Sequence, residues 1–250
     1  MRKIKVIISF ILIFLSFLNL FLLVKNNLSK FTEKFDPKKY EEKYNKSQYV
    51  IPNSKNPISD AELYTYAGYK YIIGENPLYL NAEHLTVGKY LIGLSTVIFN
   101  NENYSTLLII ILFILISFYL IFNLTKSLLL SSFLILLITS DSFIKDALIN
   151  GPLLDIYQLF FFFISLIFFI NWYQNKKIIY LIFIGIFLGL FSASKFYLAT
   201  LIILCTYFIF LIIIKKNPQK KFILFNFNNI FFNNNFYCNL YNIFYKRINN

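Results

Sequence analysis

The chain has 250 residues, of which 58% are hydrophobic and only 14% are charged. Ordinary soluble domains are about 45–50% apolar and about 25% charged, so this composition excludes a typical water-soluble fold and favours a membrane protein. The net charge of +12 would suit a nucleic-acid partner. However, the basic residues fall in one long polar stretch and in short clusters between apolar runs. Such short clusters orient membrane proteins, so we expect no nucleic-acid partner.

The first segment combines three basic residues, Arg2, Lys3 and Lys5, with an apolar run that reaches residue 24. The run is longer than the roughly 7–15-residue core of a cleavable signal peptide, and no small-residue cleavage site follows it. About 20 apolar residues are enough to cross the hydrocarbon core. We therefore predict a first transmembrane helix over residues 1–24. The N-terminus is expected in the cytoplasm, because basic flanks stay on that side.

Residues 25–103 form a long polar stretch, which we predict to be an extracytoplasmic loop that carries interfacial helices. Apolar residues near helical spacing in Asp60–Ile73 predict an amphipathic helix at the membrane interface. The run Tyr90–Phe99 is too short to span comfortably and predicts an interfacial or re-entrant segment. Tyrosine rings are enriched at membrane interfaces, so four of them are expected to anchor the loop there: Tyr64, Tyr66, Tyr69 and Tyr71.

Further apolar runs fill residues 104–214 and predict five more transmembrane helices. The last run, residues 178–214, is long enough for two helices and contains a polar break. If residues 90–99 stay on the outer surface, every short basic cluster falls on the cytoplasmic side, as the positive-inside rule requires. If that short run spans instead, the clusters at Lys126 and Lys176 move outside, so we prefer the first topology.

The predicted fold class is therefore an all-α, polytopic transmembrane helix bundle in the cell membrane, with six spans and one long extracytoplasmic loop. Residues 215–250 are expected to form a cytoplasmic low-complexity tail. From residue 222 onward the tail is nearly all Asn, Phe, Ile, Tyr and Leu, which AT-rich codons encode in any frame. We hypothesise a shifted reading frame or a truncated gene, and an intact frame on resequencing would remove this idea.

Ionisable residues at membrane depth are costly, so those that occur there are candidates for function. The preferred topology puts a set of them on the outer side. Asp155 would lie at the start of a helix and Lys195 in the break between two others, and both are flanked by apolar residues. For each member the alternative is a solvated loop charge without a specific role. The candidates are Asp60, Glu62, His84, Lys89, Asp155 and Lys195.

Four short segments together resemble the GT-C glycosyltransferases, most closely the protein O-mannosyltransferases and aminoarabinose transferases. Ser59–Tyr64 contains an Asp-x-Glu and resembles the start of the superfamily's first outer loop. Glu83–Ile92 resembles the His-Pro-Pro-Leu-Gly-Lys stretch that closes that loop, although a leucine and a threonine stand in place of the two prolines. Leu154–Ile156 fits a Leu-Asp motif at the next outer helix start. Gly189–Phe196 resembles a Gly-Leu-x-x-Ser-x-Lys segment.

The resemblance implies a GT-C-like N-terminal half that performs an inverting sugar transfer. The sugar would move from a polyprenyl phosphate to an unknown acceptor at the extracytoplasmic face. The resemblance assigns Asp60 as the base that takes the acceptor's proton, with Glu62 as its partner. Asp155 would orient the acceptor or bind a cation. Donor-phosphate binding would fall to two lysines and the histidine: Lys89, Lys195 and His84.

Other interpretations remain open. Three carboxylates and one histidine would suit Mg²⁺ or Mn²⁺, but they show no compact ligand spacing, and no other cofactor is indicated. The chain stops short of the further helices and acceptor-binding part that such enzymes carry, so a non-catalytic fragment or an assembly partner is one rival. A transporter or flippase for a lipid-linked sugar is a second rival. It is less favoured because we find no internal repeat.

Overall fold

The computed structural model describes residues 2–216, and within them the chain forms eleven α-helices and no β-strand. This confirms the predicted all-α class. The predicted tail and its frameshift lie outside the described residues from residue 217 onward. The helices are α1 (Arg2–Asn26), α2 (Leu28–Thr32), α3 (Pro37–Asn45), α4 (Asp60–Ile72), α5 (Val87–Phe99), α6 (Asn103–Thr125), α7 (Leu128–Ser140), α8 (Ser142–Ile149), α9 (Leu154–Asn175), α10 (Ile178–Ser192) and α11 (Tyr197–Lys216).

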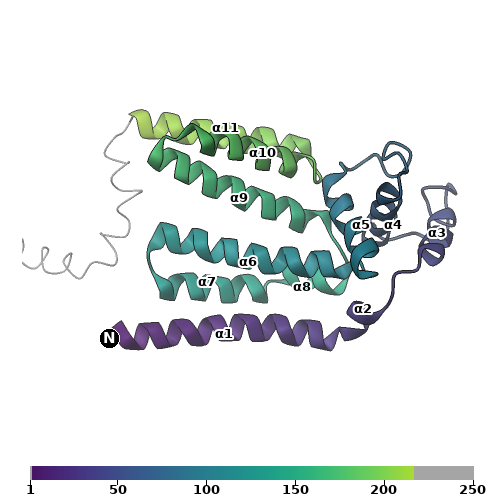
Figure 1. Cartoon of the computed structure of the whole chain (residues 1–250), viewed down its shortest axis with the longest axis horizontal. Coiled ribbons are helices and arrows are strands. Elements are labelled where there is room, and N and C mark those ends of the chain that lie inside the picture. The colour runs from purple at the N-terminus through teal and green to yellow at the C-terminus, as the bar shows by residue number, and fades with distance from the viewer. Residues whose placement is uncertain (1, 217–250) are drawn as a thin grey trace, which may run out of the picture.

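The long helices form a bundle with a helical cap at one end (Figure 1). Helices α1, α7, α6, α9, α10 and α11 pack in that order, each against the next. Helices α2 to α5 gather at the end of the bundle opposite the N-terminus, as Figure 1 shows. The turns between α6 and α7 and between α9 and α10 lie at the N-terminal end. The bundle therefore separates a capped end from an end that carries the short basic turns.

Three helices, α1, α6 and α9, are long and apolar enough to cross a membrane. A fourth span is present if the bent pair α7 and α8 counts as one. Helix α10 and the apolar part of α11 are shorter. At 1.5 Å per residue, the 15 residues of α10 rise about 22 Å, less than the roughly 30 Å hydrocarbon core. All six bundle helices predicted from the apolar runs are present, and three or four of them have the length of a span.

The bundle helix expected after Lys126 is not continuous, because the chain bends by 47° between α7 and α8. Asp141 stands at the break with an extended backbone, φ −66° and ψ 142°. Its carboxylate accepts a hydrogen bond of 2.8 Å from the backbone N–H of Phe143 and so caps α8. A short polar side chain that bonds its own backbone competes with a continuing helix, which explains the break.

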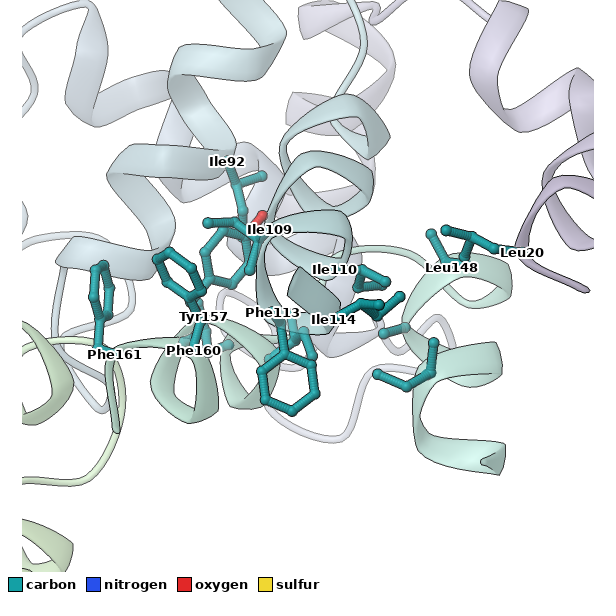
Figure 2. Close-up of a cluster of buried hydrophobic side chains, with 14 of the residues drawn as sticks. Leu20, Ile92, Ile109, Ile110, Phe113, Ile114, Leu148, Tyr157, Phe160 and Phe161 are labelled. Carbon is teal, nitrogen blue, oxygen red and sulfur yellow. The ribbon is translucent and has the colours of Figure 1, made fainter. Parts of the chain in front are cut away.

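Helices α6 and α9 supply much of the main core, to which α1, α8 and, from the cap, Ile92 of α5 also contribute (Figure 2). Phe113 of α6 and Tyr157 of α9 are both buried in this cluster. The Tyr157 hydroxyl pairs with Ser105 at 2.7 Å and with Thr106 at 3.1 Å. Polar groups at membrane depth need such partners, because no water is available there to form hydrogen bonds with them. The presence of Ile92 in this cluster fixes the cap to the bundle.

Helix α4 lies inside the protein, which corrects the prediction that its tyrosines anchor the loop at the membrane interface. Tyr64, Tyr66 and Tyr71 are only 2%, 3% and 4% exposed. Tyr66 and Tyr71 form a small core with Leu80, so their rings pack against protein. Tyr69 is half-buried, with its ring centroid 5.0 Å from that of Phe35. The helix is present as predicted, but most of its faces are covered by protein.

The backbones of α4 and α5 meet at two glycines. A Cβ added at Gly68 would lie 2.2 Å from the carbonyl oxygen of Lys89, and one added at Gly93 would lie 2.1 Å from the carbonyl oxygen of Gly68. Only a residue without a side chain permits this approach. The crossing brings Lys89 of α5 against Tyr64 of α4.

Candidate functional site

A capping box fixes the start of α4, where the first two candidate residues lie. The Ser59 hydroxyl accepts the backbone N–H of Glu62 at 3.4 Å, and the Glu62 carboxylate accepts the backbone N–H of Ser59 at 3.2 Å. The sequence Ser-Asp-Ala-Glu predicts this arrangement, since a serine and a glutamate three residues apart satisfy two free N–H groups of a helix start. Asp60 is thereby held at the first position of the helix, with an exposed side chain.

Glu62 faces away from the other candidates. Its carboxylate forms an ion pair with Lys43 and accepts the Ser59 hydroxyl at 2.9 Å. Burial opposes ionisation, but the hydrogen bonds from Lys43 and Ser59 lower the pKa of Glu62 overall. The side chain lines a polar cavity of about 290 Å³ between the α2–α3 segment, the start of α4 and residues 150–152. Among the described candidates, only Glu62 borders this cavity.

Tyr64, which the sequence did not suggest as a site residue, is the common neighbour of Asp60, His84, Lys89 and Asp155. Burial, followed by the negative charges of Asp60 and Asp155, raises its pKa. The His84 ring meets the Tyr64 ring edge-on, with centroids 5.8 Å apart, and the Lys89 ammonium lies 6.0 Å from the ring centre. The Tyr64 hydroxyl is buried, and no partner stands in hydrogen-bonding geometry within the described residues.

His84 lies half-buried between two aromatic rings at the capped end of the bundle. Its imidazole is 5.8 Å from the ring of Tyr64 and 5.5 Å from the ring of Phe196, both measured between centroids. Burial first, then the positive charges of Lys195 and Lys89, lowers its pKa, so the imidazole is neutral at pH 7. Its Nδ1 is buried without a partner in the described part of the chain.

Lys89 is fully buried beneath this group. Its ammonium donates to the carbonyl oxygens of Asn81 at 2.5 Å and of His84 at 2.7 Å. Burial lowers the pKa of Lys89 to about 8, and the charge of Glu83 partly opposes the shift. The lysine predicted to bind the donor phosphate thus lies close to the other candidates, with its donors directed at two backbone carbonyls.

Asp155 and Lys195 form a bidentate ion pair although 40 residues separate them in the sequence. The Lys195 ammonium lies 2.9 Å and 2.8 Å from the two carboxylate oxygens of Asp155. Asp155 stands in the first turn of α9, and Lys195 in the break between α10 and α11. The pair is not fully enclosed, since the side chains of Lys195 and Asp155 are 16% and 42% exposed.

The break that carries Lys195 is tied to two neighbouring elements. The Gln158 amide donates to the carbonyl of Phe196 at 3.2 Å and to that of Phe191 at 3.4 Å. The backbone N–H of Val87, at the start of α5, donates to the carbonyl of Ala193 at 2.9 Å. These bonds place Lys195 and Phe196 beside the group around Tyr64. The sequence offered one signal for Gln158, a polar residue one turn after Asp155 in an apolar run.

The site therefore unites five of the six predicted residues, Asp60, His84, Lys89, Asp155 and Lys195, around Tyr64 at the capped end of the bundle, whereas Glu62 borders a separate cavity. No group of three or more metal-binding side chains within residues 2–216 is placed to hold a metal ion. The arrangement offers an exposed carboxylate, a neutral imidazole and a partly open lysine cation, which together suit proton removal and anion binding.

Comparison with known proteins identifies the family. The family model described as dolichyl-phosphate-mannose-protein mannosyltransferase matches residues 83–227, more than half of the chain. The matched segment contains His84, Lys89, Asp155 and Lys195, while Asp60 and Glu62 precede it. No curated protein and no solved structure matches the chain. The chain therefore belongs to the dolichyl-phosphate-mannose-protein mannosyltransferase family, whose members are membrane glycosyltransferases of the GT-C type.

Proposed function

We propose that the chain transfers a sugar from a polyprenyl phosphate to a hydroxyl or amine acceptor at the extracytoplasmic boundary of the membrane. The observation that carries this proposal is the grouping of Asp60, His84, Asp155 and Lys195 around one buried tyrosine at the capped end of the bundle. The family match supports glycosyl transfer.

The chemistry is a single displacement at the anomeric carbon. The acceptor oxygen or nitrogen forms a bond to this carbon as the bond to the phosphate oxygen breaks, which inverts the anomeric configuration. Asp60 takes the proton that the acceptor loses, a role that an exposed carboxylate at the boundary can fill. The leaving phosphate gains negative charge, and the Lys195 ammonium stabilises it. In the absence of the donor, Asp155 neutralises the Lys195 ammonium and fixes its position through the bidentate ion pair.

The position of the basic turns supports an extracytoplasmic site. Lys126 lies in the turn between α6 and α7, and Lys176 and Lys177 lie in the turn between α9 and α10. Both turns are at the same end of the bundle as the N-terminus, opposite the cap (Figure 1). Positive charges in short loops are retained in the cytoplasm, so the capped end faces outward in this proposal.

Cysteine labelling in intact cells tests this orientation. In a background without native cysteines, Glu83→Cys is expected to react with a membrane-impermeant maleimide, because its exposed loop position lies at the capped end. Lys177→Cys, also exposed, is expected to react only after the membrane is permeabilised. Labelling of both cysteines from the same side contradicts the proposed topology.

A reconstituted assay tests the reaction itself. Proteoliposomes that contain the purified chain are supplied with a polyprenyl phosphate carrying a labelled mannose and with a serine-containing peptide. The expected products are a labelled peptide with an inverted anomeric centre and free prenyl phosphate. Movement of labelled donor across the bilayer without peptide labelling would favour a flippase. Absence of both events would favour a non-catalytic fragment or an assembly partner.

A further inference from the structure

Lys89 differs from Lys195 in having no exposed surface. The residue is 0% exposed, and its ammonium donates to the carbonyls of Asn81 and His84 at 2.5 Å and 2.7 Å. A buried cation costs free energy unless its donors are satisfied. The rings of Tyr64 and Tyr71, with centroids 6.0 Å and 5.8 Å from the ammonium, add the attraction of two aromatic faces.

The segment that supplies these carbonyls has few other attachments. Within the part of the chain that the structure describes, residues 80–85 form no backbone–backbone hydrogen bond. The Asn81 side chain is buried with both polar atoms unpaired among the described residues, and its backbone is left-handed, with a φ of 53°. The Tyr71 hydroxyl donates to the carbonyl of Leu80. The bonds from Lys89 are therefore the main restraint on Asn81–His84.

We infer that Lys89 is a positioning residue that holds the segment Asn81–His84, here called the lysine-held loop, and thereby places the His84 imidazole between Tyr64 and Phe196. This inference rests on the proposed function only in so far as His84 belongs to the donor site. Two of the three N–H donors of the ammonium are bonded to the loop carbonyls and the side chain is fully buried, so a donor phosphate could reach Lys89 only if the loop moved away and lost this restraint. Phosphate binding by Lys89 and an ordered loop therefore exclude each other.

Several charged and titratable groups face the buried ammonium or its loop. Glu83 and His84 belong to the loop, while Tyr64 and Tyr71 come from α4. The positive charge of Lys195 lowers the pKa of His84, and the negative charge of Asp60 raises it. Burial lowers the pKa of Lys89 to about 8, whereas an opened loop returns the ammonium to water and to its ordinary pKa of 10.5. The open form then binds the proton more tightly, so raising the pH from 8 to 10.5 favours the closed loop.

Cysteine accessibility measures the restraint without any need for activity. Leu80 is 7% exposed, so a Leu80→Cys probe in a background without native cysteines reacts with a soluble maleimide only when the loop opens. Lys89→Met is expected to raise the labelling rate about tenfold or more, because the two hydrogen bonds from Lys89 to the loop carbonyls are lost. Lys70→Met is the matched control, since Lys70 lies on α4 and pairs with Glu41 and Glu75.

A pH series supplies a second readout that does not depend on the stability of the variant. The labelling rate of Leu80→Cys is divided by that of Ala82→Cys, an exposed position in the same loop, which cancels the ionisation of the thiol. With Lys89 present, this ratio is expected to fall as the pH rises from 8 to 10. With Lys89→Met, the ratio is expected to stay constant over the same range.

Kinetics separate positioning from phosphate binding. Lys195→Met is expected to raise the donor KM about tenfold or more, whereas Lys89→Met is expected to lower kcat and leave the donor KM within about twofold. An equal rise in donor KM for both variants would overturn the inference, as would unchanged Leu80→Cys labelling in Lys89→Met. If the wild-type chain transfers no sugar, the proposed function fails, while the labelling results still decide whether Lys89 holds the loop.

Discussion

Replacement of Asp60 by asparagine is expected to lower the rate of sugar transfer by about 10²–10⁴-fold, the usual contribution of a positioned general base. Asparagine keeps the size of the side chain but cannot accept the acceptor's proton. The capping bonds at the start of α4 involve Ser59 and Glu62, so the helix is expected to form normally. The measurement is peptide labelling in proteoliposomes at saturating donor, with helix content checked by circular dichroism.

Asp141→Asn provides the matched control for this substitution. Asp141 caps α8 through the backbone N–H of Phe143, and asparagine caps helices about as well as aspartate does. The residue lies at the α7–α8 break and lacks any contact with Tyr64 or His84 in the described structure, so its replacement is expected to leave turnover unchanged. Full activity in Asp60→Asn would rule out the base role assigned to Asp60.

The helices of the bundle could be predicted because apolar runs of sufficient length have few alternatives in a membrane. The polar break that separates α10 from α11 lies where the sequence indicated. The bend between α7 and α8 could not be predicted with the same rule. The bend depends on the single helix cap at Asp141. From the sequence alone, an aspartate in an apolar run is equally compatible with a charge inside a continuous helix.

The sequence predicts which residues make up the candidate site, but not which way their side chains point. Counting the predicted helices places Asp60, Asp155 and Lys195 at the same end of the bundle. The ion pair between Asp155 and Lys195, however, depends on the break between α10 and α11, which Gln158 holds through hydrogen bonds. The inward face of α4 was missed because tyrosines suit both a membrane interface and a protein core. The sequence places Glu62 two residues from Asp60, and only the helix geometry shows that Glu62 points into another cavity.

The replacement of the two family prolines by Leu85 and Thr86 has a structural counterpart. Thr86 precedes α5 without a side-chain cap, so neither proline stiffness nor a capping bond fixes the helix start. The bond from the Val87 N–H to the Ala193 carbonyl and the two bonds from Lys89 supply the restraint instead. Because these contacts are tertiary, inspection of the loop sequence alone does not reveal them.

Replacement of Gly93 by alanine is expected to destabilise the cap more strongly than any single change at its surface. The new Cβ would lie 2.1 Å from the carbonyl oxygen of Gly68 and 2.3 Å from its carbonyl carbon. Both atoms belong to the backbone of α4, so a side-chain rotation cannot relieve the clash and the two helices must separate. Overpacking of this kind typically costs about 1–3 kcal/mol, occasionally more.

Gly185→Ala in α10 is the same chemical change at a position with no neighbour within 4 Å of the added Cβ. Alanine is favoured over glycine inside a helix by about 0.5–1 kcal/mol, so this control is expected to keep or raise the thermal midpoint in detergent. Gly93→Ala is expected to lower the midpoint. Helix separation would also draw Lys89 away from Tyr64, and a displacement of about 1 Å at a reacting centre can cost about 10²-fold in rate. A thermal midpoint for Gly93→Ala at or above that of the wild type would show that the contact at Gly68 does not fix the distance between α4 and α5. The placement of His84 through Lys89 would then lose its structural basis.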